Sequence, residues 1–194
     1  MQQELINQAI KMFDNEPDKW NSFLDLVWQK DTIRNNWYGI LKQALDKQFK
    51  SIDTVEKWSY NSWGLWDTHW YLTDFGDQSL SILFGWWGEL TLHANGQNFN
   101  LEAIGKLLKT SKYSPILACF NRIDNQYVGN RIAIESRNFC FDSPFDGKFD
   151  LDRLAWYAGN KTDDFVKQVQ EKVNRFRSKE ITDLLIEINE QTKI

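Results

Sequence analysis

Through the first 50 residues, apolar side chains recur every three or four positions, which is the period of an α-helix with one apolar face. Three segments show this pattern, at residues 6–13, 17–28 and 31–49. Pro17 stands near the start of the second segment, and Asp31 is a suitable N-cap for the third. We therefore expect three amphipathic helices whose apolar faces turn toward a core.

From Trp58 to His93 the pattern changes to the shorter period of β-strands. Residues 65–72 are aromatic and alternating, and two further runs cover residues 80–84 and 89–93. The last two runs are joined across Gly85-Trp86-Trp87-Gly88, a short connection that is typical of a β-hairpin.

Beyond this region, Asn100 is expected to cap a helix, and three more strands are predicted at residues 114–120, 129–134 and 138–141. The C-terminal part returns to the helical period. Asp150 can cap a short helix over residues 151–158 that Gly159 ends. A long final helix follows from Thr162 or Asp163, with a possible break near Ser178.

The order of these elements predicts an α+β fold in a single domain. In this arrangement a mostly antiparallel central sheet is covered by N-terminal and C-terminal helices. The expected divisions are helical residues 1–50, strand-rich residues 58–142 with a helix near 100–110, and helical residues 150–192.

Composition narrows the class of protein without naming it. Ten tryptophans require a substantial core, and a net charge of −4 argues against binding to nucleic acid. No signal peptide or membrane-spanning run is visible, so no membrane partner is expected. Cys119 and Cys140 fit no metal-binding spacing, and two buried thiols in a reducing, cytoplasmic setting are the simplest interpretation.

Familiar catalytic and cofactor motifs are absent from the sequence. It has no phosphate-binding glycine loop and no nucleophile elbow, and it identifies no cofactor. Residues 142–150 superficially resemble a calcium loop. However, Pro144 occupies the third position and Arg153 the twelfth, where oxygen ligands belong. An acidic turn leading into a helix cap is the favoured interpretation.

The most unusual feature is a stretch of 48 residues, between Lys57 and Lys106, that contains no lysine or arginine. It holds six of the ten tryptophans and both histidines, His69 and His93. The absence of positive charge disfavours phosphate and nucleic-acid ligands there. Neutral sugars, a basic protein segment or a divalent metal remain compatible with this stretch.

Alternation along the strands predicts that the polar residues of this stretch share one face of the sheet. The expected members are Asp67, His69, Tyr71, Glu89, Thr91 and His93. Two imidazoles and two carboxylates on one face can form an acid–base pair or a metal site, with His69, His93, Glu89 and Asp67 as candidate catalytic residues. The competing interpretation is an ordinary solvated polar face, because antiparallel sheets commonly have one.

The tryptophans of this stretch allow two interpretations as well: packing within the core, or a platform for a partner. Trp86 and Trp87 are adjacent, so they cannot both face the same core. We therefore expect at least one of them to be exposed, and we assign them, with Trp63, as candidate partner-binding residues.

Two functions from different classes follow. The first is a non-enzymatic protein-binding or regulatory module that presents this Trp/acidic surface to a protein partner or to a second copy in a homodimer. The second is a hydrolase-type enzyme that uses the His/carboxylate cluster, with or without a metal. A carbohydrate-binding face is a third possibility. The sequence itself does not decide between them.

Overall fold

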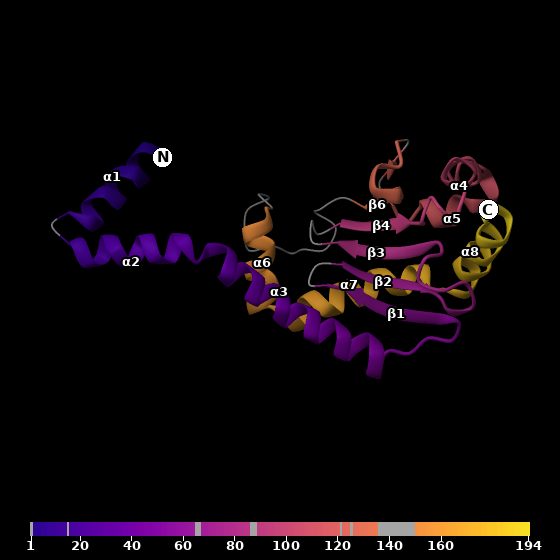
Figure 1. Ribbon diagram of the computed structural model, residues 1–194, viewed down its shortest axis with the longest axis horizontal. Coiled ribbons are helices and arrows are strands. Elements are labelled where there is room, and N and C mark those ends of the chain that lie inside the picture. Colours follow the sequence, from indigo (N-terminus) through magenta and orange to yellow (C-terminus); the bar gives the residue numbers. More distant parts are fainter. Residues whose placement is uncertain are drawn as a thin grey trace.

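The computed structural model describes residues 2–14, 16–64, 67–85, 89–120, 122–124, 126–135 and 150–194. Within these residues it shows a sheet with helices at its face and edges, and a helical arm that extends away from them (Figure 1). The predicted α+β fold class with an antiparallel sheet is confirmed.

The sheet has six strands in the order β1-β2-β3-β4-β6-β5, and every neighbouring pair is antiparallel. The strand bounds are β1 Trp58–Trp63, β2 Asp67–Leu72, β3 Ser81–Gly85, β4 Glu89–His93, β5 Arg122–Ile123 and β6 Arg131–Glu135. The first four strands follow chain order as a meander. A register shift between Leu92 and His93 marks the pairing of β4 with β6.

One face of the sheet forms the core with the C-terminal helices α7, Thr162–Phe176, and α8, Lys179–Thr192. The rings of Phe84 on β3 and Phe165 on α7 lie 5.8 Å apart between centroids. The indole N–H of Trp58 donates to Thr182 Oγ1 at 3.0 Å. These contacts join the strands to both helices, so the core spans sequence positions more than 100 residues apart.

The remaining elements lie around this core. They are α3 Lys30–Lys47, α4 Leu101–Leu108, α5 Ser114–Leu117, α6 Leu151–Asn160, the π-helix η1 Gln48–Ile52, and the 3-10 turns η2 Thr73–Phe75, η3 Ser111–Tyr113 and η4 Val128–Asn130. Helix α3 packs along α6 and also contacts α7. Among the described residues, no helix is both long enough and apolar enough to cross a membrane.

Two predicted helix caps, Asn100 and Asp150, are present as expected, whereas α7 begins at Thr162 after Lys161 without a side-chain cap. The Asn100 side chain accepts from the Ala103 N–H, and the Asp150 carboxylate accepts from the N–H groups of Asp152 and Arg153. The break foreseen near Ser178 separates α7 from α8, and the Ser178 hydroxyl accepts from the Ile181 N–H. A side-chain oxygen before the first turn satisfies backbone donors that otherwise lack partners, which is why these positions could be predicted.

Other local predictions are wrong. Residues 114–120 form no strand, because a short helix, α5, begins at Ser114 directly after the turn η3, with Pro115 in its first turn. Asp31 does not cap α3, which starts at Lys30 after Gln29; it lies in the first turn instead. The predicted strand at residues 138–141 lies outside the described residues.

Gly159 does not end α6, which continues to Asn160. Its role is in packing. A Cβ added at this position would lie 2.0 Å from Cδ1 of Trp37 on α3, far inside van der Waals contact. The missing side chain therefore lets α6 and α3 approach each other closely. The sequence pattern indicated a helix end at Gly159, but the residue serves close helix packing instead.

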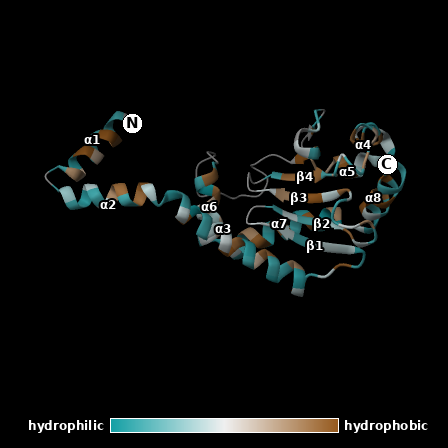
Figure 2. Ribbon diagram, viewed as in Figure 1, coloured by the Kyte–Doolittle hydropathy of each residue, from teal (hydrophilic) through white to brown (hydrophobic). Residues whose placement is uncertain are grey.

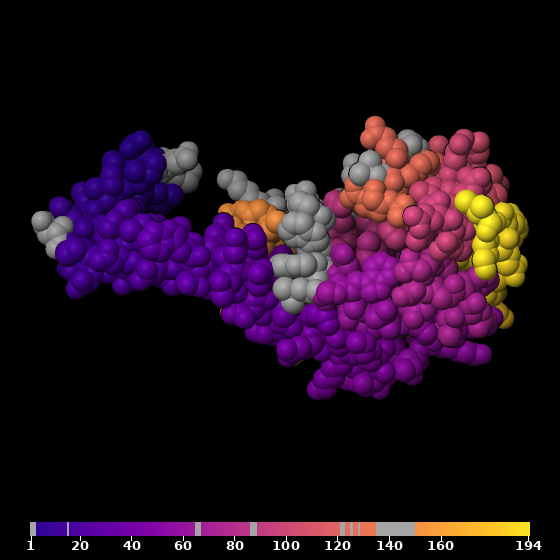
Figure 3. All heavy atoms as spheres, viewed as in Figure 1, coloured from indigo at the N-terminus to yellow at the C-terminus, as the bar shows by residue number. Residues whose placement is uncertain are grey.

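The N-terminal helices depart most from expectation. Helix α1, Gln2–Phe13, and helix α2, Pro17–Trp28, project from the domain as an arm instead of turning their apolar faces to the core (Figures 1 and 3). Helix α2 has no buried residue. Only α3, which follows α2 after the single residue Gln29, carries the N-terminal region onto the domain, through buried Tyr38, Leu41 and Leu45.

Candidate functional site

The candidate catalytic residues do share one face of the sheet, as alternation predicted. His69 on β2 lies opposite Leu83 on β3, and Leu83 lies opposite Thr91 on β4. His93 lies two pairs further along β4, opposite Ser81. The side chains of His69 and His93 reach across β3 toward each other, with ring centroids 6.0 Å apart and planes nearly perpendicular at 85°.

This face is not a solvated polar surface at its centre. His69 has no exposed area, and neighbouring Thr91 is only 3% exposed. Trp63 on β1 lies over His69, with 3.5 Å between the ring centroids. Neither ring nitrogen of His69 has a hydrogen-bond partner among the described residues. A buried polar ring without such partners is uncommon in folded proteins, so this residue is a notable feature of the sheet.

Burial decides the charge state of both histidines. Burial, assisted by the neighbouring His93, lowers the pKa of His69 to about 3, although Asp77 acts in the opposite direction. Burial also lowers the pKa of His93 to about 4. A charged imidazole loses its hydration in such a place, and the neutral form is favoured. Both rings are therefore neutral at physiological pH.

Both candidate carboxylates lie beside Gly85 of β3, at the end of the sheet where β2 and β4 begin. Asp67 begins β2 beside Gly85, where an added Cβ would be 3.5 Å from Asp67 Oδ1, and burial raises the pKa of Asp67. Glu89 begins β4 and accepts from Arg131 on β6 at 3.3 Å, while Arg131 also lies 3.9 Å from Asp124. The carboxylate of Glu89 thus belongs to an ion-pair group that reaches β6.

These positions limit what the cluster can do chemically. Among the described residues, no group of three or more His, Cys, Asp or Glu side chains could hold a metal ion. Two neutral imidazoles are good ligands or bases in principle, but His69 offers no surface to a substrate. The geometry suits a buried His69, packed between Trp63 and His93, better than an open reaction centre.

Of the three candidate partner-binding tryptophans, the structure describes only Trp63. Trp63 is half-buried, and its ring packs on His69 instead of standing free. Trp86 and Trp87 lie outside the described residues, so their predicted exposure is unaffected by the structure. Cys119 is buried, as expected, and Cys140 is also outside the described residues.

A different surface, the arm, was missed by the sequence reasoning. Its exposed apolar side chains are Leu5, Ile6, Ile10, Met12, Trp20, Phe23, Leu26, Val27 and Trp28. Trp28 is 74% exposed and Ile10 63%. Figure 2 shows hydrophobic residues along both helices of this projecting segment. The apolar periodicity was the correct signal, but it does not tell whether the apolar face meets the chain's own core or something else.

The two helices of the arm meet only near their junction. The ring centroids of Phe13 and Trp20 are 5.2 Å apart, those of Phe13 and Phe23 are 5.0 Å apart, and Trp20 stacks on Phe23. From this aromatic corner α1 and α2 diverge (Figure 1). Their inner sides therefore cannot cover each other along their whole length.

At the root of the arm lies an apolar groove with a volume of about 390 Å³. Phe23, Leu26 and Val27 of α2 form one side of it, and Ile33 and Trp37 of α3 continue it toward α6. Lys30, Arg34 and Asp152 also line the groove. The groove thus extends the apolar surface of α2 to the domain.

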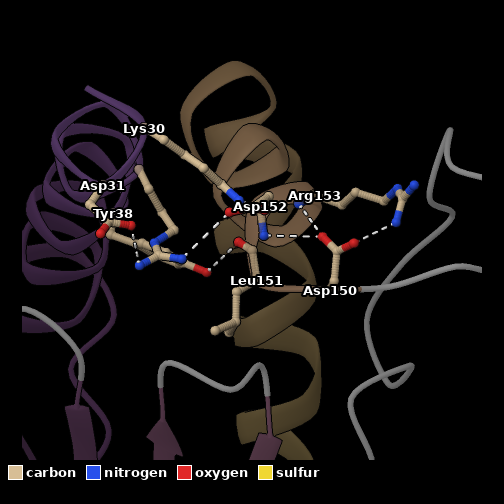
Figure 4. A network of polar contacts seen from close by, with 8 residues as sticks. Lys30, Asp31, Tyr38, Asp150, Leu151, Asp152 and Arg153 are labelled. Atoms are coloured by element: carbon tan, nitrogen blue, oxygen red, sulfur yellow. Dashed lines mark hydrogen bonds and ion pairs between the residues drawn. The ribbon is translucent and has the colours of Figure 1, made fainter. Parts of the chain in front are cut away.

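A polar network holds this root in place (Figure 4). Asp152 on α6 accepts from Lys30 at 2.5 Å and from Arg34 at 3.5 Å, and Arg34 also pairs with Asp31 at 2.8 Å. Tyr38 donates to the Leu151 carbonyl at 3.1 Å. The first turns of α3 and α6 are therefore tied together, which gives the arm a defined base.

A second hollow, about 290 Å³ in volume, lies between η1, the β1–β2 edge and the end of α7. At its wall Arg177 donates to Asp53 at 2.5 Å and lies over the ring of Phe49 at 5.5 Å. The Arg177 side chain is only 3% exposed and Asp53 15%. Gln170 also donates to Asp53 at 3.2 Å. These contacts join η1 to α7, and we interpret the ion pair as structural.

Comparison with known proteins gives no relative from which a role could be transferred. No family model, no curated protein and no solved structure matches the chain. Its function must therefore be argued from its own surfaces. Of those described, the arm is the most unusual for a folded protein, because it carries nine of the twelve exposed large apolar side chains among the described residues.

Proposed function

We propose that this chain is a non-enzymatic protein-binding module and that the α1–α2 arm is its docking surface. The observation that carries the proposal is the extent of the apolar surface on the arm. At the usual sizes of these side chains, the nine exposed ones leave on the order of 900 Å² uncovered. The largest apolar patch on a typical monomer is only about 300–600 Å².

The charge of the arm supports a protein partner over nucleic acid. Residues 2–28 contain two basic side chains, Lys11 and Lys19, and five acidic ones. A surface that binds nucleic acid needs an excess of positive charge to replace the counterions of the phosphates. An apolar and mildly acidic surface suits burial against another protein instead.

The hydrolase-type alternative has weaker geometric support. It uses His69 together with His93, and although His93 is partly exposed, His69 has no exposed surface and Trp63 packs over it. Glu89 is also engaged with Arg131. Exchange of His69 for phenylalanine, which keeps the ring volume, is therefore expected to leave partner binding unchanged.

The proposal is tested by affinity capture with the tagged full-length chain, using quantitative comparison of variants. The double variant Ile10→Lys/Val27→Lys places charges on the exposed apolar side of the arm, and Ile40→Lys/Ile52→Lys is the matched control at exposed positions outside it. We expect the first to lose at least about 90% of the captured partner and the control to retain it.

A third variant, Trp86→Ala/Trp87→Ala, addresses the central hairpin surface that the sequence predicted. Loss of the partner in this variant, with retention in the arm variant, would move the docking surface to the hairpin. Equal capture by all variants would remove the binding-module proposal altogether.

A further inference from the structure

The exposed apolar area of the arm is suited to burial against the same arm of a second chain. Its uncovered apolar area, on the order of 900 Å², is close to the roughly 800 Å² that each partner contributes to a stable interface of standard size. One arm presents two helices, and two arms present four. Four amphipathic helices around a shared apolar centre are a stable and common packing unit.

The positions of the charges favour such pairing. A helix turns by 3.6 residues, so Glu4 and Lys11 lie on the side of α1 opposite Ala9 and Phe13. In the same way, Asp18 and Asp25 lie on the side of α2 opposite Val27. Two acidic arms can therefore meet apolar side to apolar side without burying these four charges, which would be costly if unpaired.

The same positions disfavour a basic amphipathic helix as the occupant. Such a partner is held by acids along the rim of the apolar surface, and charge complementarity then sets its orientation. On the arm, Asp18 and Asp25 point away from the apolar side of α2, and Glu4 points away from that of α1. The charged residue nearest the apolar side of α2 is Lys19, which pairs with Glu16 at 3.2 Å, so the surface lacks the row of acids that a basic helix would need.

The shape of the arm also permits this arrangement. Helices α1 and α2 diverge from the corner formed by Phe13, Trp20 and Phe23, so their inner sides are open to another helix (Figure 1). The arm extends beyond the domain (Figure 3), which leaves room for a second domain at its far end. A two-fold axis through the arms then places the two domains on opposite sides of the shared bundle.

We propose that the occupant of the arm is a second copy of this chain, and that the two α1–α2 arms associate as a four-helix bundle in a two-fold symmetric dimer. This inference rests on the proposed function, because it names the partner of the same surface. Each chain contributes the apolar side of both helices, and the groove at the arm root, lined by Leu26 and Trp37, extends the shared interface.

The test is the mass of the full-length chain in solution, measured by light scattering during size-exclusion chromatography at about 1–100 μM. Wild type is expected at twice the 23.0 kDa chain mass. Ile10→Lys/Val27→Lys is expected at the monomer mass, with a dissociation constant raised at least about 100-fold, because each interface would bury added like charges. Circular dichroism checks that this variant keeps its helices.

Each outcome bears on the inference. A dimer that persists in Ile40→Lys/Ile52→Lys and dissociates in the arm variant supports it. A wild-type monomer at 100 μM overturns it, as does a dimer that the arm variant leaves intact or an assembly larger than two chains. If wild type is monomeric yet loses a different protein partner in the arm variant, the binding-module proposal stands and only the second copy is rejected.

Discussion

At the scale of single residues, the contact between buried His69 and half-buried His93 is the least expected part of the molecule. His69 and His93 are held neutral by burial, and the ring nitrogens of His69 lack described partners. Such residues make folding sensitive to acid, since the unfolded chain binds protons that the folded chain rejects.

The pH dependence of stability tests this. The folded pKa of His69, about 3, lies below the unfolded value near 6.5, so its contribution is present above pH 6.5 and is lost as the pH falls from there toward 3. We expect urea unfolding to show a loss on the order of 2 kcal/mol per histidine between pH 7 and 5, above the range where most carboxylates titrate.

The variant His69→Phe distinguishes the contribution of His69 to this pH dependence from that of His93. It should show about half of the wild-type loss between pH 7 and 5, because only His93 then remains. His93→Phe serves as the reciprocal variant. If both variants follow the wild-type pH dependence, the two imidazoles are not held neutral in the folded state.

A second residue-scale prediction concerns the ion pair between η1 and α7. In Asp53→Ala, the Arg177 side chain, 3% exposed, keeps Asn174 as a partner but loses its carboxylate. Removing one member of a buried pair costs about 3 kcal/mol, because the remaining charge stays desolvated. The free energy of unfolding, measured with urea, should fall accordingly. Asp31→Ala is the control, because its partner Arg34 also pairs with Asp152, and should cost less than about 1 kcal/mol.

At the scale of elements, the contact of α3 with α6 depends on a missing side chain. In Gly159→Ala the added Cβ meets the ring of Trp37. Helix propensity favours alanine by about 1 kcal/mol, but overpacking costs about 1–3 kcal/mol, so we expect net destabilisation. Thermal unfolding of Gly159→Ala with and without Trp37→Leu measures the coupling. Additive effects in the two variants would show that this contact does not limit the approach of the helices.

Element types could be predicted well where local chemistry decides them. Asn100, Asp150 and Ser178 cap helices because their side-chain oxygens serve nearby N–H groups. The common face of His69 and His93 follows from strand alternation. The short apolar run at residues 114–120 was ambiguous, and Pro115 lies in the first turn of a helix there. Burial of His69 could not be predicted, since it depends on Trp63 from the neighbouring strand.

At the scale of the whole molecule, the arm shows that apolar periodicity predicts an amphipathic helix but not the surface that its apolar face contacts. The pattern of α1 and α2 is that of core-facing helices, yet most of their large apolar side chains are exposed. An apolar helix face favours burial, but the sequence pattern does not specify which surface buries it. The same pattern in α3 does meet the domain, through Leu41 and Leu45.

Stability should therefore depend on concentration if the arms associate. Binding between folded copies raises the melting temperature as concentration increases. We expect wild type to melt several degrees higher at 100 μM than at 1 μM, and Ile10→Lys/Val27→Lys to melt at one temperature throughout. Differential scanning calorimetry across this range checks the effect. A melting temperature that does not change with wild-type concentration would contradict it.

The uneven placement of lysine and arginine has a practical consequence for mapping these surfaces by proteolysis. Trypsin cuts only after basic residues, so it has no target between Lys57 and Lys106, and β1 to β4 emerge within one long peptide. The arm, by contrast, offers exposed Lys11 and Lys19. Early tryptic cleavage in that part of the chain therefore reports on the arm and not on the sheet, and its slowing with rising protein concentration would give a direct footprint of the bundle.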